Sequence, residues 1–262
     1  MPVPTRFTDE LLQRPNTDGL DVVTKLRHFV LITYAVAPER IRPHVHERFE
    51  LDTFTGSDGK PYVWLSVVPF EDADFHFVNL PLLNFRFGQT NYRTYVIDRE
   101  TGQAAVWFFG TTLGSWSIAI PRYLWHLPWH SGNIRFDTQY DSKQRRYTHY
   151  RMTTSSTWAA ADLEIEDTGQ AVSDLEGFPD LEAGLVKLTH PLIGAYYRRD
   201  GKLGSYHVWH DRLQCTVGQM KNARFDLLNR LGLVTLDEQQ TPHSILMQPE
   251  TEFIIKLPPT TL

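Results

Sequence analysis

The residues best suited to catalysis gather in one stretch of the chain, from Ala104 to Phe136. Its centre reads PRYLWHLPWH and ends at His130, which follows Pro128 and Trp129. Histidine is the usual general acid or base near neutral pH, and an apolar wall beside the ring would lower its pKa and keep it neutral. We predict that His130 is an acid/base catalyst; a hydrogen-bonded structural role is the alternative for any one of the 11 histidines.

Two arginines, Arg93 and Arg122, each lie within mainly apolar sequence. A guanidinium in such surroundings needs a carboxylate partner or an anionic ligand. We predict that both belong to the catalytic site and hold an anionic substrate group, while a buried ion pair with Asp or Glu explains them equally well. The side chains predicted to contact the ligand are Asn91, Tyr123, Trp129, Phe109 and His210. Asn91 and Tyr123 would orient a carbonyl, or else cap a turn and fill the core.

The sequence contains no strong signal for a metal site or for a catalytic nucleophile. His207 and His210 are three residues apart in a segment predicted to be a strand, where such a pair points to opposite faces. The chain has no G-x-S-x-G, P-loop or G-x-G-x-x-G motif, and its single cysteine, Cys215, lies in an alternating apolar pattern typical of a core. We therefore predict no metal and no cofactor.

Composition places the chain among globular proteins. Hydrophobic residues make up 41% and charged residues 22% of the 262 residues, which argues against disorder. A net charge of -5 provides no basic field for nucleic acid. The N-terminal sequence lacks the apolar core of a signal peptide, and no apolar run of about 18 residues occurs. We expect a cytoplasmic protein with no membrane or nucleic-acid partner.

Strands dominate the predicted elements. The pattern predicts strands at Leu26–Val36, Pro61–Phe70 and Arg93–Ile97, the last forming a hairpin with AAVWFF, and a half-buried strand over Ser205–Val217. Loops are predicted from Glu71 to Asn84 and over residues 159–179. A helix over Asn222–Leu231 ends at Gly232, and two short strands, Ser244–Met247 and Glu252–Leu257, close the chain. Residues 1–24 are predicted to be a surface arm and residues 25–262 one domain.

The ordered segments TNYRTYV, VWFFGTT, PRYLWHLPWH, DGKLGSYHVWH and PHSILM resemble the YqjF-like family of uncharacterised proteins, which is placed in the acetoacetate decarboxylase-like superfamily. The resemblance extends over about Leu26 to Leu257. It implies a β-rich α+β fold, with a closed or cone-shaped barrel around an internal cavity, a few peripheral helices and assembly into homo-oligomers.

The resemblance also implies a lost mechanism. Acetoacetate decarboxylases carry two adjacent lysines after a Phe-Pro, and one of them forms a Schiff base. Those lysines fall on Trp129 and His130 here, and the superfamily's active-site glutamate falls on or near Arg93. Neither indole nor imidazole can form an imine. The seven lysines present are expected in polar turns, near chain ends or on solvated helix faces: Lys25, Lys60, Lys143, Lys187, Lys202, Lys221 and Lys256.

Two functions are consistent with these residues. The first is a lyase-like enzyme (dehydratase, cyclase or aldol-type) that acts on a small carbonyl or carboxylate metabolite by acid/base chemistry without a Schiff base. The second is a non-catalytic protein that binds a small molecule in the same aromatic cavity. Fold alone does not choose between them.

Overall fold

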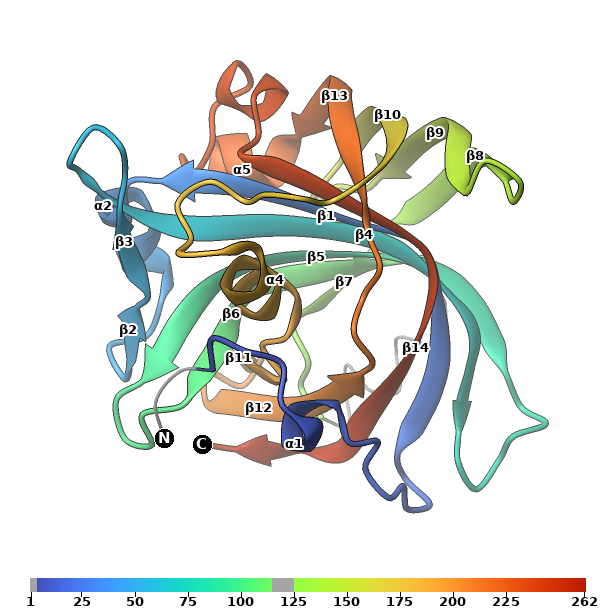
Figure 1. Ribbon diagram of the computed structural model, residues 1–262. Coiled ribbons are helices and arrows are strands. Elements are labelled where there is room, and N and C mark those ends of the chain that lie inside the picture. Colours follow the sequence, from blue (N-terminus) through green and yellow to red (C-terminus); the bar gives the residue numbers. More distant parts are fainter. Residues whose placement is uncertain (1–3, 115–124) are drawn as a thin grey trace.

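A closed ring of seven strands forms the centre of the molecule, seen in a computed structural model that describes residues 4–114 and 125–262 (Figure 1). In ring order the strands are β1 (Val22–Val36), β4 (Pro61–Phe77), β5 (Phe85–Asp98), β6 (Ala104–Leu113), β11 (Ile193–Tyr197), β12 (Leu203–His210) and β14 (Ser244–Thr261). The ring closes because β1 pairs with β14, from Val22 opposite Ile255 to Thr33 opposite Ser244. Only β6 and β11 pair in parallel within this ring.

A second sheet leaves the ring through β14. The first half of β14 also pairs with β13 (Thr216–Phe225), and the sheet then continues outside the barrel, at the upper right of Figure 1. Its further strands are β10 (Ala161–Ala171), β9 (Arg146–Ser155) and β8 (Asn133–Asp141). Three short strands pair with β5, β4 and β6 respectively: β2 (Phe49–Leu51), β3 (Thr53–Thr55) and β7 (Trp129–Ser131).

Helices are few and short. They are α1 (Asp9–Leu12), α2 (Pro38–Ile41), α4 (Leu181–Thr189) and α5 (Asp226–Arg230), with 3-10 turns η1 (Arg42–His44) and η3 (Glu238–Gln240). The chain is 55% strand and 11% helix, which confirms the predicted β-rich α+β class with a closed barrel. In Figure 1, α4 lies across the ring of strands. None of the described helices is long and apolar enough to cross a membrane.

Strand alternation separates two hydrophobic cores. On β1, Phe29 and Leu31 pack inside the barrel, in the same cluster as Leu188 of α4. Val30 and Ile32 face the other way, into the layer between the barrel and the second sheet. The barrel interior is therefore closed from outside by a packed layer and from one end by α4.

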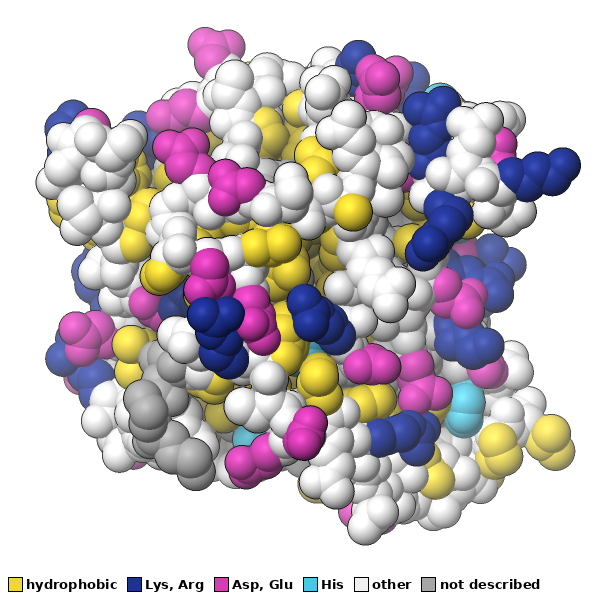
Figure 2. Space-filling model, in the orientation of Figure 1, with side chains coloured by type: hydrophobic (Ala, Val, Ile, Leu, Met, Phe, Trp, Pro, Cys, Tyr) yellow, Lys and Arg dark blue, Asp and Glu magenta, His cyan; other side chains and the backbone are white. Residues whose placement is uncertain are grey.

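Residues 4–21 lie against their own chain. Arg6 forms ion pairs with Asp180 and Glu182 at the start of α4, and Trp209 on β12 donates its indole N–H to the carbonyl of Leu12 at 3.3 Å. These contacts attach residues 4–21 to α4 and to β12. On the face of the molecule seen in Figure 2, basic and acidic side chains lie interspersed.

Five predicted elements change in the structure. The acidic Glu71–Phe77 segment continues β4, so the loop contains only residues 78–84. Residues 159–179 contain β10, and the alternating Ser205–Val217 segment divides between β12 and β13. The helix before Gly232 is shorter because residues 222–225 end β13. The two C-terminal strands are one. Pairing with neighbours, which single-sequence patterns do not report, decides each case.

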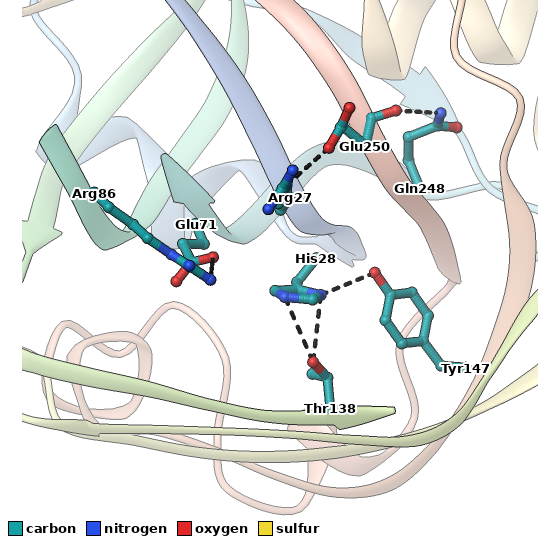
Figure 3. Close-up of polar contacts among 8 residues, drawn as sticks. All are labelled: Arg27, His28, Glu71, Arg86, Thr138, Tyr147, Gln248 and Glu250. Atoms are coloured by element: carbon teal, nitrogen blue, oxygen red, sulfur yellow. Dashed lines mark hydrogen bonds and ion pairs between the residues drawn. The ribbon is translucent and has the colours of Figure 1, made fainter. Parts of the chain in front are cut away.

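His28 joins the barrel to the second sheet (Figure 3). It interrupts the β1–β4 register with a φ of 53°, and its Nδ1 lies 3.0 Å from the hydroxyl of Tyr147 on β9. The hydroxyl of Tyr150 donates to the His28 carbonyl at 2.7 Å. Burial lowers the pKa of His28, and the charges of Arg27 and Arg86 lower it further, whereas Glu71 raises it. The neutral ring is therefore the form that fits this junction.

We predict that the contribution of His28 to stability falls as the pH drops. Its folded pKa is lowered, so the stabilisation is present above the unfolded pKa, near 6.5, and is lost as the pH falls toward the folded pKa. The difference in unfolding free energy between wild type and His28→Asn, measured in urea, should be smaller at pH 5 than at pH 7.5. Asparagine is chosen because it tolerates a positive φ. Tyr150→Phe, which removes no group that titrates in this range, should show the same difference at both values; a difference for His28→Asn that did not shrink would contradict the prediction.

Candidate functional site

A polar pocket lies inside the barrel, between the strands and the C-terminal end of α4. Its volume is about 70 Å³, room for about five water molecules or a ligand of a few heavy atoms. Its polar lining consists of Thr24, Asp72, Gln89, Asn91, Arg93, Thr189, Tyr206 and His210, and apolar side chains such as Phe29 and Phe108 complete the wall. Convergent polar groups in an otherwise apolar enclosure are typical of ligand sites.

Arg93 supplies the pocket's positive charge. Its Nη2 donates to the Leu188 carbonyl at 3.1 Å, near the C-terminus of α4, and its guanidinium carbon lies 5.8 Å from the ring centre of Tyr95. The Nε atom is buried without a hydrogen-bond partner, and no carboxylate of the described residues forms an ion pair with this side chain. The partial negative charge at the helix C-terminus favours a cation there, but it leaves the guanidinium with donors to spare.

Two amide side chains, Gln89 and Asn91, precede Arg93 on β5 and line the same pocket. Gln89 donates from Nε2 to Asn91 Oδ1 at 2.9 Å, and the hydroxyl of Thr111 donates to the same oxygen at 2.8 Å. These bonds fix the orientation of the Asn91 amide. Among the described residues none accepts a hydrogen bond from Asn91 Nδ2, so this group can donate to a ligand oxygen.

Asp72 is the buried carboxyl of the pocket. It is 2% exposed; Oδ1 accepts a hydrogen bond from the hydroxyl of Thr24 at 2.9 Å, whereas Oδ2 is buried without a partner. Burial raises the pKa of Asp72 to about 7, against a smaller lowering by the Thr24 hydrogen bond, and the nearby charge of Glu71 adds to the rise. A carboxyl with this pKa exchanges protons readily at neutral pH.

His210 forms a neutral part of the wall. Its Nδ1 lies 2.8 Å from the Asp211 carbonyl, its Nε2 lies 2.8 Å from the Thr189 carbonyl, and its ring stacks on Phe253. The two carbonyls favour an imidazolium, which alone could donate to both. Burial outweighs them and, together with the charge of Arg93, lowers the pKa of His210 to about 4. The ring is consequently uncharged at neutral pH.

An apolar pocket of about 50 Å³ adjoins the polar pocket. The two share Gln89, Tyr206 and Ile255 in their walls. The remaining lining of the apolar pocket is Val22, Phe75, Phe77, Trp125, Leu127, Trp129, Leu257 and Pro259. No charged side chain of the described residues belongs to this lining.

Some of the predicted site residues line these pockets, and others lie in the hydrophobic core between the barrel and the second sheet, called here the outer core. Asn91, Arg93 and His210 line the polar pocket, and Trp129 lines the apolar pocket. His130 lies on the other face of β7 and stacks on Trp158, with ring centres 3.8 Å apart and planes 5° apart.

Phe109 likewise faces the outer core, since it packs against that cluster and its ring lies edge-on to His44. Neighbouring residues on a strand face opposite sides, so Trp129 and Phe108 point inward where His130 and Phe109 point outward. Arg122 and Tyr123 lie outside the described residues.

Sequence reasoning missed Asp72 and Gln89. Asp72 stands in a charged run interpreted as a loop, yet it continues the inward phase of Val68 and Phe70 on β4, and all three line the polar pocket. Gln89 stands two residues before Asn91 on β5. If the inward-facing positions are continued in steps of two residues beyond each predicted strand end, they include both Asp72 and Gln89.

Lys187 differs from its expected solvated position. Its side chain is 17% exposed and forms an ion pair with Asp52, and burial lowers its pKa to about 8. It lines a small recess with His190 and Pro191 rather than the polar pocket. None of the seven lysines belongs to the described lining of either pocket.

We predict that Asp72→Asn stabilises the protein at alkaline pH. Because the folded pKa of about 7 exceeds the unfolded value near 3.8, the stability that the protonated carboxyl confers is complete below pH 4 and is lost as the pH rises through 7. The variant's advantage over wild type in urea unfolding should grow by about 3 kcal/mol between pH 4.5 and pH 8. Asp162→Asn, which removes an exposed carboxylate paired with Arg151 in the second sheet, is the matched control; an equal pH dependence in both variants would refute the assignment.

Comparison with known proteins gives a family and a fold. A model of the DUF2071 family, described as "Uncharacterized conserved protein (COG2071)", matches residues 23–252. No curated protein sequence matches the chain. Several solved structures share its fold at low identity. An acetoacetate decarboxylase-like enzyme from Sphingomonas wittichii RW1 is 10% identical with a TM-score of 0.59, and 94% of each chain is covered.

Two further structures support the same fold. The acetoacetate decarboxylase of Legionella pneumophila subsp. pneumophila str. Philadelphia 1 is 11% identical with a TM-score of 0.57, covering 96% of this chain and 92% of the other. The enduracididine biosynthesis enzyme MppR, complexed with pyruvate, is 10% identical with a TM-score of 0.54, covering 95% and 92%. The chain therefore belongs to the DUF2071 family, the YqjF-like family that its motifs resemble, and has the acetoacetate decarboxylase-like fold.

Proposed function

We propose that this protein is an enzyme that acts on a small carbonyl or carboxylate metabolite by acid/base chemistry, without a Schiff base. The observation that carries the proposal is that one polar pocket holds both Arg93, which has no carboxylate partner among the described residues, and Asp72, whose pKa is raised to about 7. A second line of support is the chemistry of related folds: MppR is seen with pyruvate and with the condensation product of pyruvate and imidazole 4-carboxaldehyde.

Each pocket residue has a role in this chemistry. Arg93 binds the substrate carboxylate through its unused donors. The ionised Asp72 takes a proton from the carbon next to the substrate carbonyl, and the electron pair of that C–H bond moves onto the carbonyl oxygen. Asn91 Nδ2 donates to this oxygen as its charge develops. The enolate then recovers the proton from Asp72, expels a leaving group in a dehydration, or attacks a second carbonyl in an aldol-type step or cyclisation.

The proposal assigns the acid/base role to Asp72 rather than to His130. His130 stacks on Trp158 on the outer face of β7, away from the lining of the polar pocket. Arg93 keeps its predicted role, and His210 becomes a neutral contact. A binding protein without turnover would use the same pockets, so the test must detect a chemical step.

Deuterium exchange tests for that step. In D2O, the protein should replace the methyl protons of pyruvate by deuterium, seen as loss of the methyl signal in proton NMR, because enolisation is the first step of every reaction in this class. Asp72→Asn should lower the exchange rate at least about 100-fold. Arg93→Gln should raise the half-saturating concentration about tenfold, the effect of losing a charge-assisted hydrogen bond. Asp162→Asn, which removes an exposed carboxylate paired with Arg151 in the second sheet, serves as the control with unchanged exchange.

Two outcomes would count against the proposal. Exchange that is equally fast in Asp72→Asn would remove Asp72 from the reaction. Saturable binding of small oxo acids such as pyruvate, 2-oxobutyrate and acetoacetate, without exchange in any of them, would favour the binding protein.

Borohydride trapping tests the absence of an imine. Treatment of the protein with pyruvate or acetoacetate and sodium borohydride should leave its intact mass unchanged, because no lysine belongs to the described lining of the polar pocket. A Schiff-base decarboxylase treated in parallel is the positive control. A stable adduct, located by peptide mapping at Lys187 or any other lysine, would overturn this part of the mechanism.

A further inference from the structure

The apolar pocket has no role in the chemistry proposed above, which needs only the polar pocket. We propose that it binds an apolar, preferably aromatic, group of the substrate, so that the preferred substrate is an oxo acid with an aryl or branched alkyl tail rather than pyruvate. This inference rests on the proposed function and names its substrate class.

Continuity of the two pockets supports this assignment. Gln89, Tyr206 and Ile255 line both, so a ligand that enters one can extend into the other. Tyr206 stacks on Phe108 at this junction, and no hydrogen bond of the described residues involves its hydroxyl. That hydroxyl is available to a polar atom in the middle of a ligand.

The order of side chains along the strands gives the ligand a direction. On β5 the inward residues run from Arg93, beside α4, through Asn91 to Gln89, about 13 Å along the strand. On β4 the same direction leads past Asp72 to Phe75 and Phe77. The carboxylate site thus lies at one end and the aromatic side chains at the other, with Asp72 between them. A three-carbon acid held at Arg93 would leave the aromatic end empty.

The lining of the apolar pocket selects the kind of tail. Trp125, Trp129, Phe75 and Phe77 offer ring faces and edges that favour another aromatic ring over a polar chain. Its described lining includes no charged side chain to compensate a buried polar tail, so such a tail would lose its hydration without replacement.

Isothermal titration calorimetry with three probes tests the inference. The probes are pyruvate, phenylpyruvate and 4-phenylbutan-2-one, which keeps the aromatic tail and the ketone but lacks the carboxylate. Wild type should bind phenylpyruvate at least about tenfold more tightly than pyruvate. Trp129→Ala should abolish this ratio and leave the pyruvate Kd within about twofold. Trp129→Phe should retain most of the ratio, which separates loss of the aromatic wall from loss of folding.

Two further variants complete the design. Arg93→Gln should weaken both acids and leave the ketone unaffected, because only the acids carry the group that Arg93 would bind. Trp209→Phe, which alters an indole outside both pockets, should leave all three affinities unchanged.

The outcomes distinguish this inference from the function on which it rests. Equal affinity of wild type for pyruvate and phenylpyruvate, with both dependent on Arg93, would overturn the substrate class while the proposed function stands. A phenylpyruvate preference that survives Trp129→Ala in a folded protein would also overturn it. Failure of every oxo acid to bind would overturn both.

Discussion

The antiparallel pairing of β1 with β14 is the contact on which the enclosure of the two pockets depends. These strands come from opposite ends of the chain, and their pairing from Val22 to Thr33 turns an open sheet into a ring. An open sheet would expose one face to water, whereas the ring and α4 enclose it. Enclosure is what gives Asp72 its raised pKa and leaves the charge of Arg93 poorly hydrated. The second sheet continues from β14, so the outer layer depends on the same strand.

Two groups respond to this enclosure in opposite ways. Arg93 cannot lose its proton, so it retains a charge that the carbonyl of Leu188 only partly compensates. Asp72 avoids the cost of a buried charge by keeping its proton near neutral pH. A bound carboxylate would compensate Arg93 without requiring Asp72 to ionise. The polar pocket therefore has a positive charge without a full counter-charge at Arg93, and a carboxyl at Asp72 whose pKa lies near neutral pH. Such an arrangement suits an anionic substrate that undergoes proton transfer.

Sequence patterns predicted most strands of the ring but not which way their side chains point. The hairpin of β5 and β6 is predicted by its pattern, and three of the predicted site residues, Arg93, Asn91 and His210, line the polar pocket. The sequence does not show which residues of β7 face the barrel interior. His130 and Trp129 are adjacent, so a shift of one residue in the strand exchanges the faces on which they lie. Asp72 was missed for another reason: the composition of EDADFHF suits a loop, and only pairing with β1 and β5 makes it a strand. The closing contact joins residues more than 200 positions apart, which no local pattern encodes.

The exchange of lysine for Trp129, which the family resemblance suggests, changes more than the loss of an imine. A lysine at this inward position would place an ammonium beside the apolar pocket, within the same enclosed space as Asp72. Its charge would favour ionised Asp72 and would bring water into the barrel. An indole does neither, and burial remains the largest cause of the raised pKa of Asp72. The substitution that the resemblance suggests would therefore remove the electron sink and leave Asp72 with the raised pKa on which the proposed acid/base mechanism rests.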